Sequence, residues 1–301
     1  MNQFKRRIKG FLQSVDNKLP FSQKISRLER KTSYLGKETQ ILLSLKYREL
    51  LHQGLLLPSF EEVEFQAFSQ NGEDGILLYL FSLIGTINKK AVEICAGDGM
   101  ECNTANLIIN HGWNALLFDG NKENIRRGQE FYAKCSDTWL WPPTLVNAWI
   151  TAENINSLIV NNGFEGEIDL LSLDLDGVDY WVWKAISCVK PRVVLVEFNN
   201  LWGAEHAVTV PYKADFRAEN NSTGTDYRGA SLPAFVKLGQ EKGYRLVGCQ
   251  RYGFNAFFIR AGIGEDIFPE ISASKCFDHP FAQHAIQKRL SKIVDREWVN
   301  I

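Results

Sequence analysis

A turn with two glycines, followed by an acid on the next apolar run, is the first pattern in this sequence that could bind a ligand. Residues 92–99 lead from an apolar segment, typical of a β-strand, into a turn that contains Gly97 and Gly99. Glycines let a backbone approach a ligand where a Cβ atom would clash. Asp119 ends the next apolar run, 20 residues after Gly99, where an acid can bind ribose hydroxyls. The pattern predicts a nucleoside site; the alternative is a tight turn beside a helix-capping aspartate.

The acids around this turn favour a positively charged nucleoside over a dinucleotide. A dinucleotide fingerprint needs the pattern G-x-G-x-x-G, with the pyrophosphate at a helix N-terminus. Here Cys95 stands where the first glycine is expected, and Glu101 would place a negative charge beside a pyrophosphate. Glu93, on the preceding apolar run, suits a nucleoside that carries a cationic amino-acid group. NAD-dependent redox chemistry is therefore disfavoured.

A second pattern places polar side chains at the ends of two later apolar runs. Asp174 and Asp176 end one run, and Glu197 and Asn199 end the next. Side chains alternate along a strand, so neighbouring strand ends would bring three carboxylates and an amide together. Such hard oxygen ligands suit Mg²⁺ or Mn²⁺, and we expect Asp174, Glu197 and Asn199 to bind it. The alternative is that one acid acts as a base while the others cap helices or bind arginines.

The same part of the sequence, from the acids near 174 to residue 228, also contains candidates for proton transfer and for substrate binding. Asp176 and His206 are the candidates for taking a proton from a substrate. The segment 199–228 is long for a loop, and long loops at a ligand-binding edge are often functional. Its aromatic rings could stack on sugars and its cations could hold phosphate or carboxylate. The candidates for substrate binding are Lys213, Tyr227 and Arg228. The alternatives are a surface histidine and a variable surface loop.

The elements that must position these residues alternate along the chain. Apolar runs typical of strands lie at 91–95, 113–118, 145–150, 168–175 and 192–198, and helical segments at 74–84, 104–110, 152–161, 180–189 and 231–243. Runs at 244–249 and 255–260 are expected to close as a strand pair. This alternation predicts an α/β fold: a doubly wound, Rossmann-like, mostly parallel sheet with a C-terminal antiparallel strand pair. Such sheets bind ligands at the carboxyl ends of their strands.

The first sixty residues differ from the rest and are expected to form an N-terminal helical extension, 1–60. Residues 1–31 hold nine Lys or Arg residues against two acids, around an apolar stripe at helical spacing. A second helical stretch is expected at about 23–53. The extension could cover its own domain, dimerise, or lie on a membrane surface. Residues 266–301 are expected to form a C-terminal helical tail.

Length and composition exclude several classes of protein. The chain has 301 residues, of which 45% are hydrophobic and 23% charged, so it is neither disordered nor of low complexity. No apolar run approaches the roughly 20 residues of a membrane span. A net charge of −1 provides no general attraction for nucleic acid. The sequence shows neither a cleavable signal nor the cysteine spacing of a metal site, so we expect a cytoplasmic location, with the inner membrane face as a further option.

Several short motifs between about residues 66 and 262 together identify a family. They are SQNGED at 69–74, GMECNT at 99–104 after Glu93, LDLDGVD at 173–179, VEFN at 196–199, VPY at 210–212, GASL at 229–232 and GYRLVGC at 243–249. This set resembles the FkbM-like methyltransferases of bacterial surface-polysaccharide and natural-product clusters. Glu93, Gly97, Gly99 and the later acid, Asp119, also resemble motifs I and II of class I S-adenosylmethionine-dependent methyltransferases.

The resemblance implies a methyltransferase domain over 61–265 that uses S-adenosylmethionine. It implies O-methylation of a sugar, sugar-phosphate or glycan acceptor in surface-polysaccharide biosynthesis. Separately, the acids and the amide at the two strand ends resemble the cation sites of metal-dependent catechol-type O-methyltransferases, so assistance by a divalent metal is a further expectation. Lys213 and Arg228 depart from the family pattern, which has an acid and an aromatic residue there, and their charge indicates an acidic or phosphorylated acceptor. The implied donor-binding residues are Gln70, Glu93, Gly97, Gly99 and Asp119.

Three other functions stay open at this point. Asp174 and Asp176 also form the D-x-D motif with which metal-dependent glycosyltransferases hold a nucleotide-sugar diphosphate. The second is an NAD-dependent oxidoreductase, and the third a non-enzymatic domain that scaffolds an assembly at a membrane. The expected partner is a small-molecule or glycan acceptor rather than nucleic acid, and a homo-oligomer and peripheral membrane contact through the N-terminal helix are further options.

Overall fold

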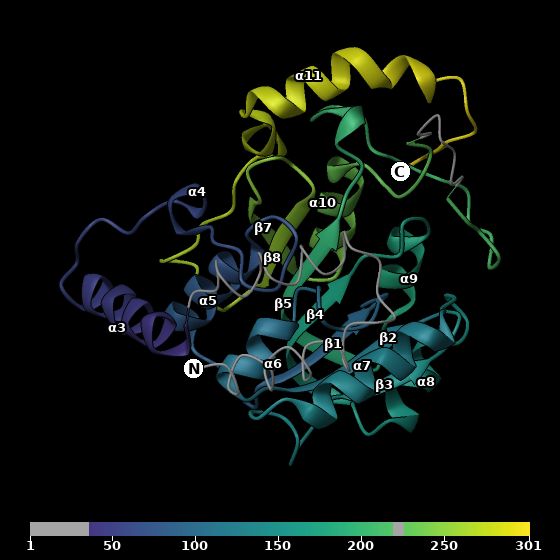
Figure 1. Cartoon of the computed structure of the whole chain (residues 1–301). Helices are drawn as coiled ribbons and strands as arrows, with labels where there is room; N and C mark the ends of the chain where they lie inside the picture. The colour runs from purple at the N-terminus through teal and green to yellow at the C-terminus, as the bar shows by residue number, and fades with distance from the viewer. Residues whose placement is uncertain (1–35, 219–225) are drawn as a thin grey trace, which may run out of the picture. The chain divides into compact units, whose positions relative to one another are not determined.

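A seven-stranded sheet of order β3-β2-β1-β4-β5-β8-β7 lies at the centre of the computed structural model, which describes residues 36–218 and 226–301 (Figure 1). Its strands are β1 Lys90–Ile94, β2 Asn114–Asp119, β3 Thr144–Asn147, β4 Gly166–Leu173, β5 Val189–Glu197, β7 Tyr244–Cys249 and β8 Asn255–Arg260. The first five pair in parallel, and β8 is antiparallel to β5 and β7. The predicted α/β fold with its C-terminal antiparallel pair is confirmed. The expected basic helix within 1–31 lies outside the described residues.

Helices cover both faces of the sheet. One core packs the strands against α8 Ile155–Asn161, α9 Asp179–Ala185 and α10 Leu232–Glu241. The other packs them against α3 Lys37–His52, α5 Glu73–Ile84, α6 Ala105–His111 and α7 Lys122–Lys134. The remaining elements are α4 Phe60–Val63, η1 Asn200–Trp202, β6 Val208–Thr209, η2 Ala273–Phe277, α11 Pro280–Arg289, η3 Leu290–Lys292 and β9 Val299–Asn300.

The strands read as short apolar runs because both sheet faces are buried. On β1, Val92 and Ile94 join one core while Ala91 joins the other, as the two-residue period of a strand requires. All three side chains are fully buried. The strand order reverses between β1 and β4, which are neighbours in the sheet. In doubly wound sheets, the crevice at the carboxyl ends of two such strands is where ligands bind.

The described part of the N-terminal extension packs on the sheet domain. The Gln40 side chain of α3 is fully buried, and its amide donates to Asn106 Oδ1 at 3.0 Å. Ser44 and Ser82 join α3 to α5 through their hydroxyls at 2.7 Å. Residues Lys37–Ile301 thus form one compact unit. Within 36–218 and 226–301, no helix combines the length and the apolar character that crossing a membrane requires.

The C-terminal residues lie at the carboxyl edge of the sheet. Helix α11 contacts η1, the turn that follows β5, and crosses this edge above the strands in Figure 1. The short strand β9 pairs antiparallel with β6, which belongs to the long segment after β5. The C-terminal tail therefore supports the segment that the sequence assigns to substrate binding.

Candidate functional site

A cavity of ≈ 350 Å³ opens at the carboxyl ends of β1, β2 and β4. This volume lies within the range of about 300–1,000 Å³ that is usual for small-molecule sites. The cavity is lined by Gln70, Glu73, Glu93, Cys95, Ala96, Gly97, Glu101, Cys102, Asn103, Asp119, Asp174, Leu175, Asp176 and Asn255. It coincides with the crevice where the strand order reverses, so it is the candidate ligand site.

The charge of the lining is one-sided. Six of its side chains are carboxylates: Glu73, Glu93, Glu101, Asp119, Asp174 and Asp176. None of the lining residues that the structure describes is a Lys, Arg or His. Two like charges 4 Å apart repel by about 4 kcal/mol at the effective dielectric of a protein surface. The cavity therefore suits a ligand that carries positive charge and many hydrogen-bond donors.

Gly97 of the glycine turn lines the cavity, whereas Gly99, the other glycine predicted to bind the donor, does not, because it faces Leu117 and Tyr132. Gly97 and Gly99 have φ angles of +59° and +70°, in the left-handed region that glycine tolerates. A Cβ atom on Gly97 would have no neighbour within 4 Å, so this face is open to a ligand. Cys95, which stands where a further glycine is expected, also has a positive φ of +64°. Strained backbone in a non-glycine residue is typical of functional sites.

Asp119 binds the glycine turn from the neighbouring strand. Its Oδ2 atom accepts a hydrogen bond from the Gly97 backbone N–H at 3.1 Å. Its Oδ1 atom accepts from the backbone N–H of Asn121 at 2.8 Å and from the Asn124 side chain at 3.1 Å. Carboxylate oxygens have further lone pairs, and Asp119 lines the cavity. The predicted pairing of an acid on β2 with the β1 turn is thus present as a direct contact.

Glu93 connects the same turn to helix α6. Only 2% of its surface is exposed. Its Oε1 atom accepts from the Asn103 N–H at 2.9 Å and from the Ser172 hydroxyl at 3.4 Å. Its Oε2 atom accepts from the Thr104 N–H at 2.8 Å and from the Thr104 hydroxyl. Glu93 therefore holds the segment after the glycine turn against β4, and its negative charge lies at the cavity wall.

The segment before α5 also contributes to the lining of the cavity. The Asp74 Oδ2 atom accepts from the backbone N–H groups of Ala67, Phe68 and Ser69 at 2.8, 2.6 and 2.7 Å. These bonds position the next residue, Gln70, which lines the cavity as predicted. Burial raises the pKa of Asp74 to about 6, while the three N–H groups oppose that increase.

Two further lining residues, Glu73 and Asn255, were not singled out from the sequence. Asn255 is 7% exposed and begins β8, where it is the register partner of Glu197 on β5. Its amide donates to Glu73 Oε1 at 2.8 Å, and its own carbonyl oxygen, Oδ1, is buried with no hydrogen-bond partner among the described residues. A polar residue at the start of the apolar run 255–260 was the available signal.

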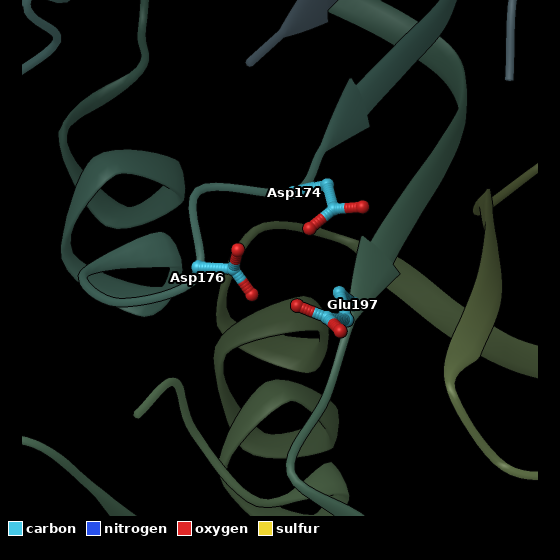
Figure 2. Close-up of side chains that lie close together, drawn as sticks. All are labelled: Asp174, Asp176 and Glu197. Atoms are coloured by element: carbon cyan, nitrogen blue, oxygen red, sulfur yellow. The ribbon is translucent and has the colours of Figure 1, made fainter. Parts of the chain in front are cut away.

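The three acids after β4 and β5 come together, as predicted. Asp174, Asp176 and Glu197 each place a carboxylate oxygen within 4.8 Å of the other two, and Figure 2 shows the three groups facing a shared space. The cause differs from the expected strand alternation, because β4 ends at Leu173 and Asp176 lies in a turn with φ +54°. Asp179 holds that turn by accepting from the N–H groups of Leu175 and Gly177 at 2.6 and 3.0 Å.

Asp174 and Glu197 hold protons more tightly than ordinary carboxyl groups. Burial raises the pKa of Asp174 to about 7, and the charges of Asp179 and Asp176 add to the increase, while a hydrogen bond with Glu197 opposes it. Burial, together with the charge of Asp174, raises the pKa of Glu197 well above its usual range. Both carboxyl groups therefore keep their protons to a higher pH than an exposed carboxyl group does.

Arg228 provides the positive charge next to these acids. Its Nη1 atom pairs with Asp176, and its Nη2 atom lies 3.4 Å from Glu197 Oε1. The predicted substrate-binding charge of Arg228 is therefore already compensated within the protein. The argument for an acidic acceptor now depends on Lys213, which is exposed and lines neither cavity found within the described residues.

The donors present do not fit the predicted divalent ion. The Asn199 amide donates to the backbone carbonyls of Asp226 and Arg228 at 2.8 and 2.9 Å, and its oxygen accepts from Leu201 N–H at 3.1 Å. Its side chain is thus used to fold the chain after residue 225. Two of the three carboxylates are ion-paired with Arg228, so the predicted ligands Asp174, Glu197 and Asn199 offer no common set of free oxygens.

The remaining predicted residues lie away from the large cavity. His206 is exposed, with its ring 5.7 Å from that of Trp202, and it lines neither cavity of the described chain. The Tyr227 hydroxyl donates to the Glu297 carbonyl, and the Arg296 guanidinium lies 4.5 Å from its ring. The structure therefore does not bring His206, Lys213 and Tyr227 to the carboxylates, and their roles stay predictions.

Helix α7, which the sequence reading missed, supports the glycine turn. An alanine Cβ at Gly128 would lie 2.4 Å from the Asp98 carbonyl oxygen and 2.4 Å from Leu145 Cδ2. We expect Gly128→Ala to push the turn out of place and to lower the free energy of unfolding by about 2 kcal/mol. Urea denaturation measures this loss. Gln129→Ala, at the next and exposed position, is the control, and equal stability of both variants would contradict the prediction.

Comparison with known proteins shows similarity to solved methyltransferases at the level of the fold. No protein-family model matches this sequence, and no curated protein matches it. The N-terminal domain of EvdMO1, solved with S-adenosylhomocysteine bound, has 14% identity and a TM-score of 0.42, and the match covers 75% of this chain and 96% of that one. An S-adenosylmethionine-dependent methyltransferase from Clostridium acetobutylicum ATCC 824 has 12% identity and a TM-score of 0.41, with coverage of 73% and 98%. This likeness assigns no residue role to the chain.

Proposed function

We propose that this protein is an S-adenosylmethionine-dependent methyltransferase. The observation that carries the proposal is the acidic, cation-free lining of the cavity at the β1/β4 crevice. A sulfonium nucleoside with an amino-acid tail brings a sulfonium, an ammonium and a single carboxylate, and so a net positive charge, together with a ribose, whereas a diphosphate brings only negative charge. The contact of Asp119 with Gly97 adds support, because it places an acceptor for ribose hydroxyls beside an open backbone face.

The residues of the cavity have distinct parts in this proposal. The bound donor supplies a methyl group that its positively charged sulfur makes electrophilic. Asp119 orients the ribose, Gln70 and Glu73 contribute to the lining of the same cavity, and Glu93 holds the segment after the glycine turn in place. Fixing the donor and the acceptor in one geometry removes orientational entropy before reaction, which is a large part of the rate that such a site can provide.

Asp174 is the residue best placed to take the acceptor's proton. It lines the cavity, and its pKa of about 7 is near the value that suits a general base at neutral pH. Asp176, the base expected from the sequence, is paired with Arg228. The hydroxyl of a sugar, sugar-phosphate or glycan in surface-polysaccharide biosynthesis is the proposed acceptor, and this choice depends on the resemblance to FkbM-like methyltransferases.

The glycosyltransferase alternative has less support from the same geometry. A D-x-D motif binds a nucleotide-sugar diphosphate through a metal ion held by both acids. Here Asp176 is paired with Arg228, and the wall formed by Glu73, Glu93 and Glu101 would repel a diphosphate. We therefore retain methyl transfer as the proposed activity.

Calorimetric titration of the whole protein tests the proposal. We expect S-adenosylhomocysteine to bind saturably and Asp119→Asn to weaken it about 10- to 100-fold, because a hydrogen bond to a charged group contributes about 1.5–3 kcal/mol. Asp266→Asn removes the same charge at an exposed position and serves as the control. Saturation by NADH or a UDP-sugar, with no heat from S-adenosylhomocysteine, would overturn the proposal.

A further inference from the structure

We propose that Arg228 is the built-in cation of the strand-end carboxylates, and that it takes the place a divalent metal ion would otherwise hold. The inference concerns the acceptor side of the same site and depends on the proposed function for its catalytic meaning. It starts from the disagreement between the ligands expected from the sequence and the side chains that the structure brings together. Its first consequence is that the protein performs its reaction without a divalent ion.

The first step is the charge of the cluster. Asp174, Asp176 and Glu197 converge within 4.8 Å, a distance at which carboxylates repel one another unless a positive charge or a proton compensates them. Arg228 pairs with Asp176 through Nη1 and with Glu197 through Nη2. Its planar guanidinium bridges one acid in the turn after β4 and another at the end of β5, as a shared metal ion would.

The second step is that the protein builds this position for Arg228. The Asn199 side chain binds the backbone carbonyls of Asp226 and Arg228, and so fixes the chain directly to the end of β5. The Asp226 carboxylate is in turn held by Arg289 of α11, with Nε at 2.7 Å. On the other side, the Gly229 N–H donates to the Gly177 carbonyl at 3.0 Å, in the turn that carries Asp176. Arg228 is therefore anchored to both elements that supply the acids.

The third step is an unsatisfied acceptor in the same cavity. Asn255 and Asp174 both line it, and Asn255 pairs in register with Glu197. The buried Asn255 Oδ1 atom has no hydrogen-bond partner among the described residues, although buried carbonyl oxygens are almost always bonded. The three carboxylates form an all-oxygen set of the kind that Mn²⁺ and Mg²⁺ bind, and Asn255 Oδ1 is a further oxygen in the cavity that Asp174 and Asp176 line. Removing the Arg228 side chain should therefore open a divalent-ion site.

A Mn²⁺-binding experiment tests whether Arg228 occupies the position of a divalent ion, and it needs neither methyl donor nor acceptor. Binding is measured as the loss of the free Mn²⁺ signal in electron paramagnetic resonance. We expect Arg228→Met to bind one Mn²⁺ at least tenfold more tightly than the wild type, and Arg228→Met/Asp176→Asn to lose that gain. Arg228→Lys keeps the positive charge and should bind Mn²⁺ as weakly as the wild type. Arg217→Met is the matched control, because Arg217 stacks on Trp149 instead of the acids. Wild-type binding as tight as that of Arg228→Met would overturn the inference, and so would an Arg228→Met protein that folds, by circular dichroism, and gains nothing.

Turnover gives the second readout. Wild-type methyl transfer should be unchanged by EDTA, whereas Arg228→Met should lose activity and recover part of it when Mn²⁺ is added. A merely structural role for Arg228 would produce no such rescue. Because Mn²⁺ binding needs no methyl donor, the inference fails or holds independently of the S-adenosylhomocysteine titration that tests the proposed function. Loss of wild-type turnover in EDTA would contradict it.

Discussion

Replacing Glu93 by glutamine is expected to remove most of the donor affinity and about 3 kcal/mol of the free energy of unfolding. The buried carboxylate accepts from two backbone N–H groups and two hydroxyls, of Asn103, Thr104 and Ser172. A glutamine side chain has one acceptor oxygen, and its NH₂ group would face an N–H that it cannot satisfy. The segment after the glycine turn would then shift, and with it the wall of the cavity.

Two measurements check this prediction. Urea denaturation should show the loss of stability, and calorimetric titration should show S-adenosylhomocysteine binding weakened at least about 100-fold, which corresponds to about 2.7 kcal/mol. Glu241→Gln, at an exposed position on α10, is the matched control and should change neither quantity. Wild-type stability and affinity in Glu93→Gln would show that the carboxylate does not hold the turn.

Replacing Asp174 by asparagine is expected to lower turnover by about 10²- to 10⁴-fold, the range that a general base usually contributes. The pKa of Asp174 is raised to about 7 by burial, so the carboxyl group must lose a proton before it can accept one. Wild-type turnover should therefore increase with pH up to about 7 and become constant above it. Asparagine cannot accept the proton, so the remaining activity should lack this step.

Stability should change with pH in the opposite direction. The folded-state pKa of Asp174 lies above the unfolded value, so the folded protein binds the proton more tightly between about pH 4 and pH 7. This contribution is present below pH 4 and is lost as the pH rises through 7. Denaturation at several pH values should show a smaller loss in Asp174→Asn than in the wild type, because Asp74 and Glu197, whose pKa values are also raised, still contribute. Asp266→Asn, which removes an exposed carboxylate and keeps Asp174, is the control, and an unchanged pH profile in Asp174→Asn would refute the assignment.

The parts of the site that could be predicted are those whose backbone conformation is set by the residues next to them in the sequence. Apolar runs bounded by turns place Asp119 and Asp174 at strand ends, and parallel strands bring those ends to one edge of a sheet. The two glycines mark the turn, because few other residues adopt its left-handed backbone. The acidic character of the cavity was likewise visible in Glu93 and Glu101.

Other parts depended on contacts between segments far apart in the chain. Helix α7 was missed because most of its residues are polar or charged, although the three that it buries, Ile125, Gly128 and Tyr132, recur at helical spacing on one face. Asn199 sits at a strand end like a metal ligand, yet its amide is consumed by the backbone of residues 226 and 228. The spacing of residues in the sequence does not predict a hydrogen bond between a side chain and a backbone carbonyl about 30 positions away.

The order of polar and apolar residues by itself determined the α/β sheet, the reversal of its strand order and the edge at which the carboxylates collect. These features follow from the two-residue period of strands and from the backbone freedom of glycine. Only the tertiary structure decided what neutralises those carboxylates. Arg228 follows Asp176 by 52 positions, and it reaches that acid because β6, α11 and Asn199 fold its segment back over β5. Electrostatic attraction depends on the distance between two groups in space and not on their separation in the sequence. Which cation neutralises a carboxylate therefore depends on how the whole chain folds.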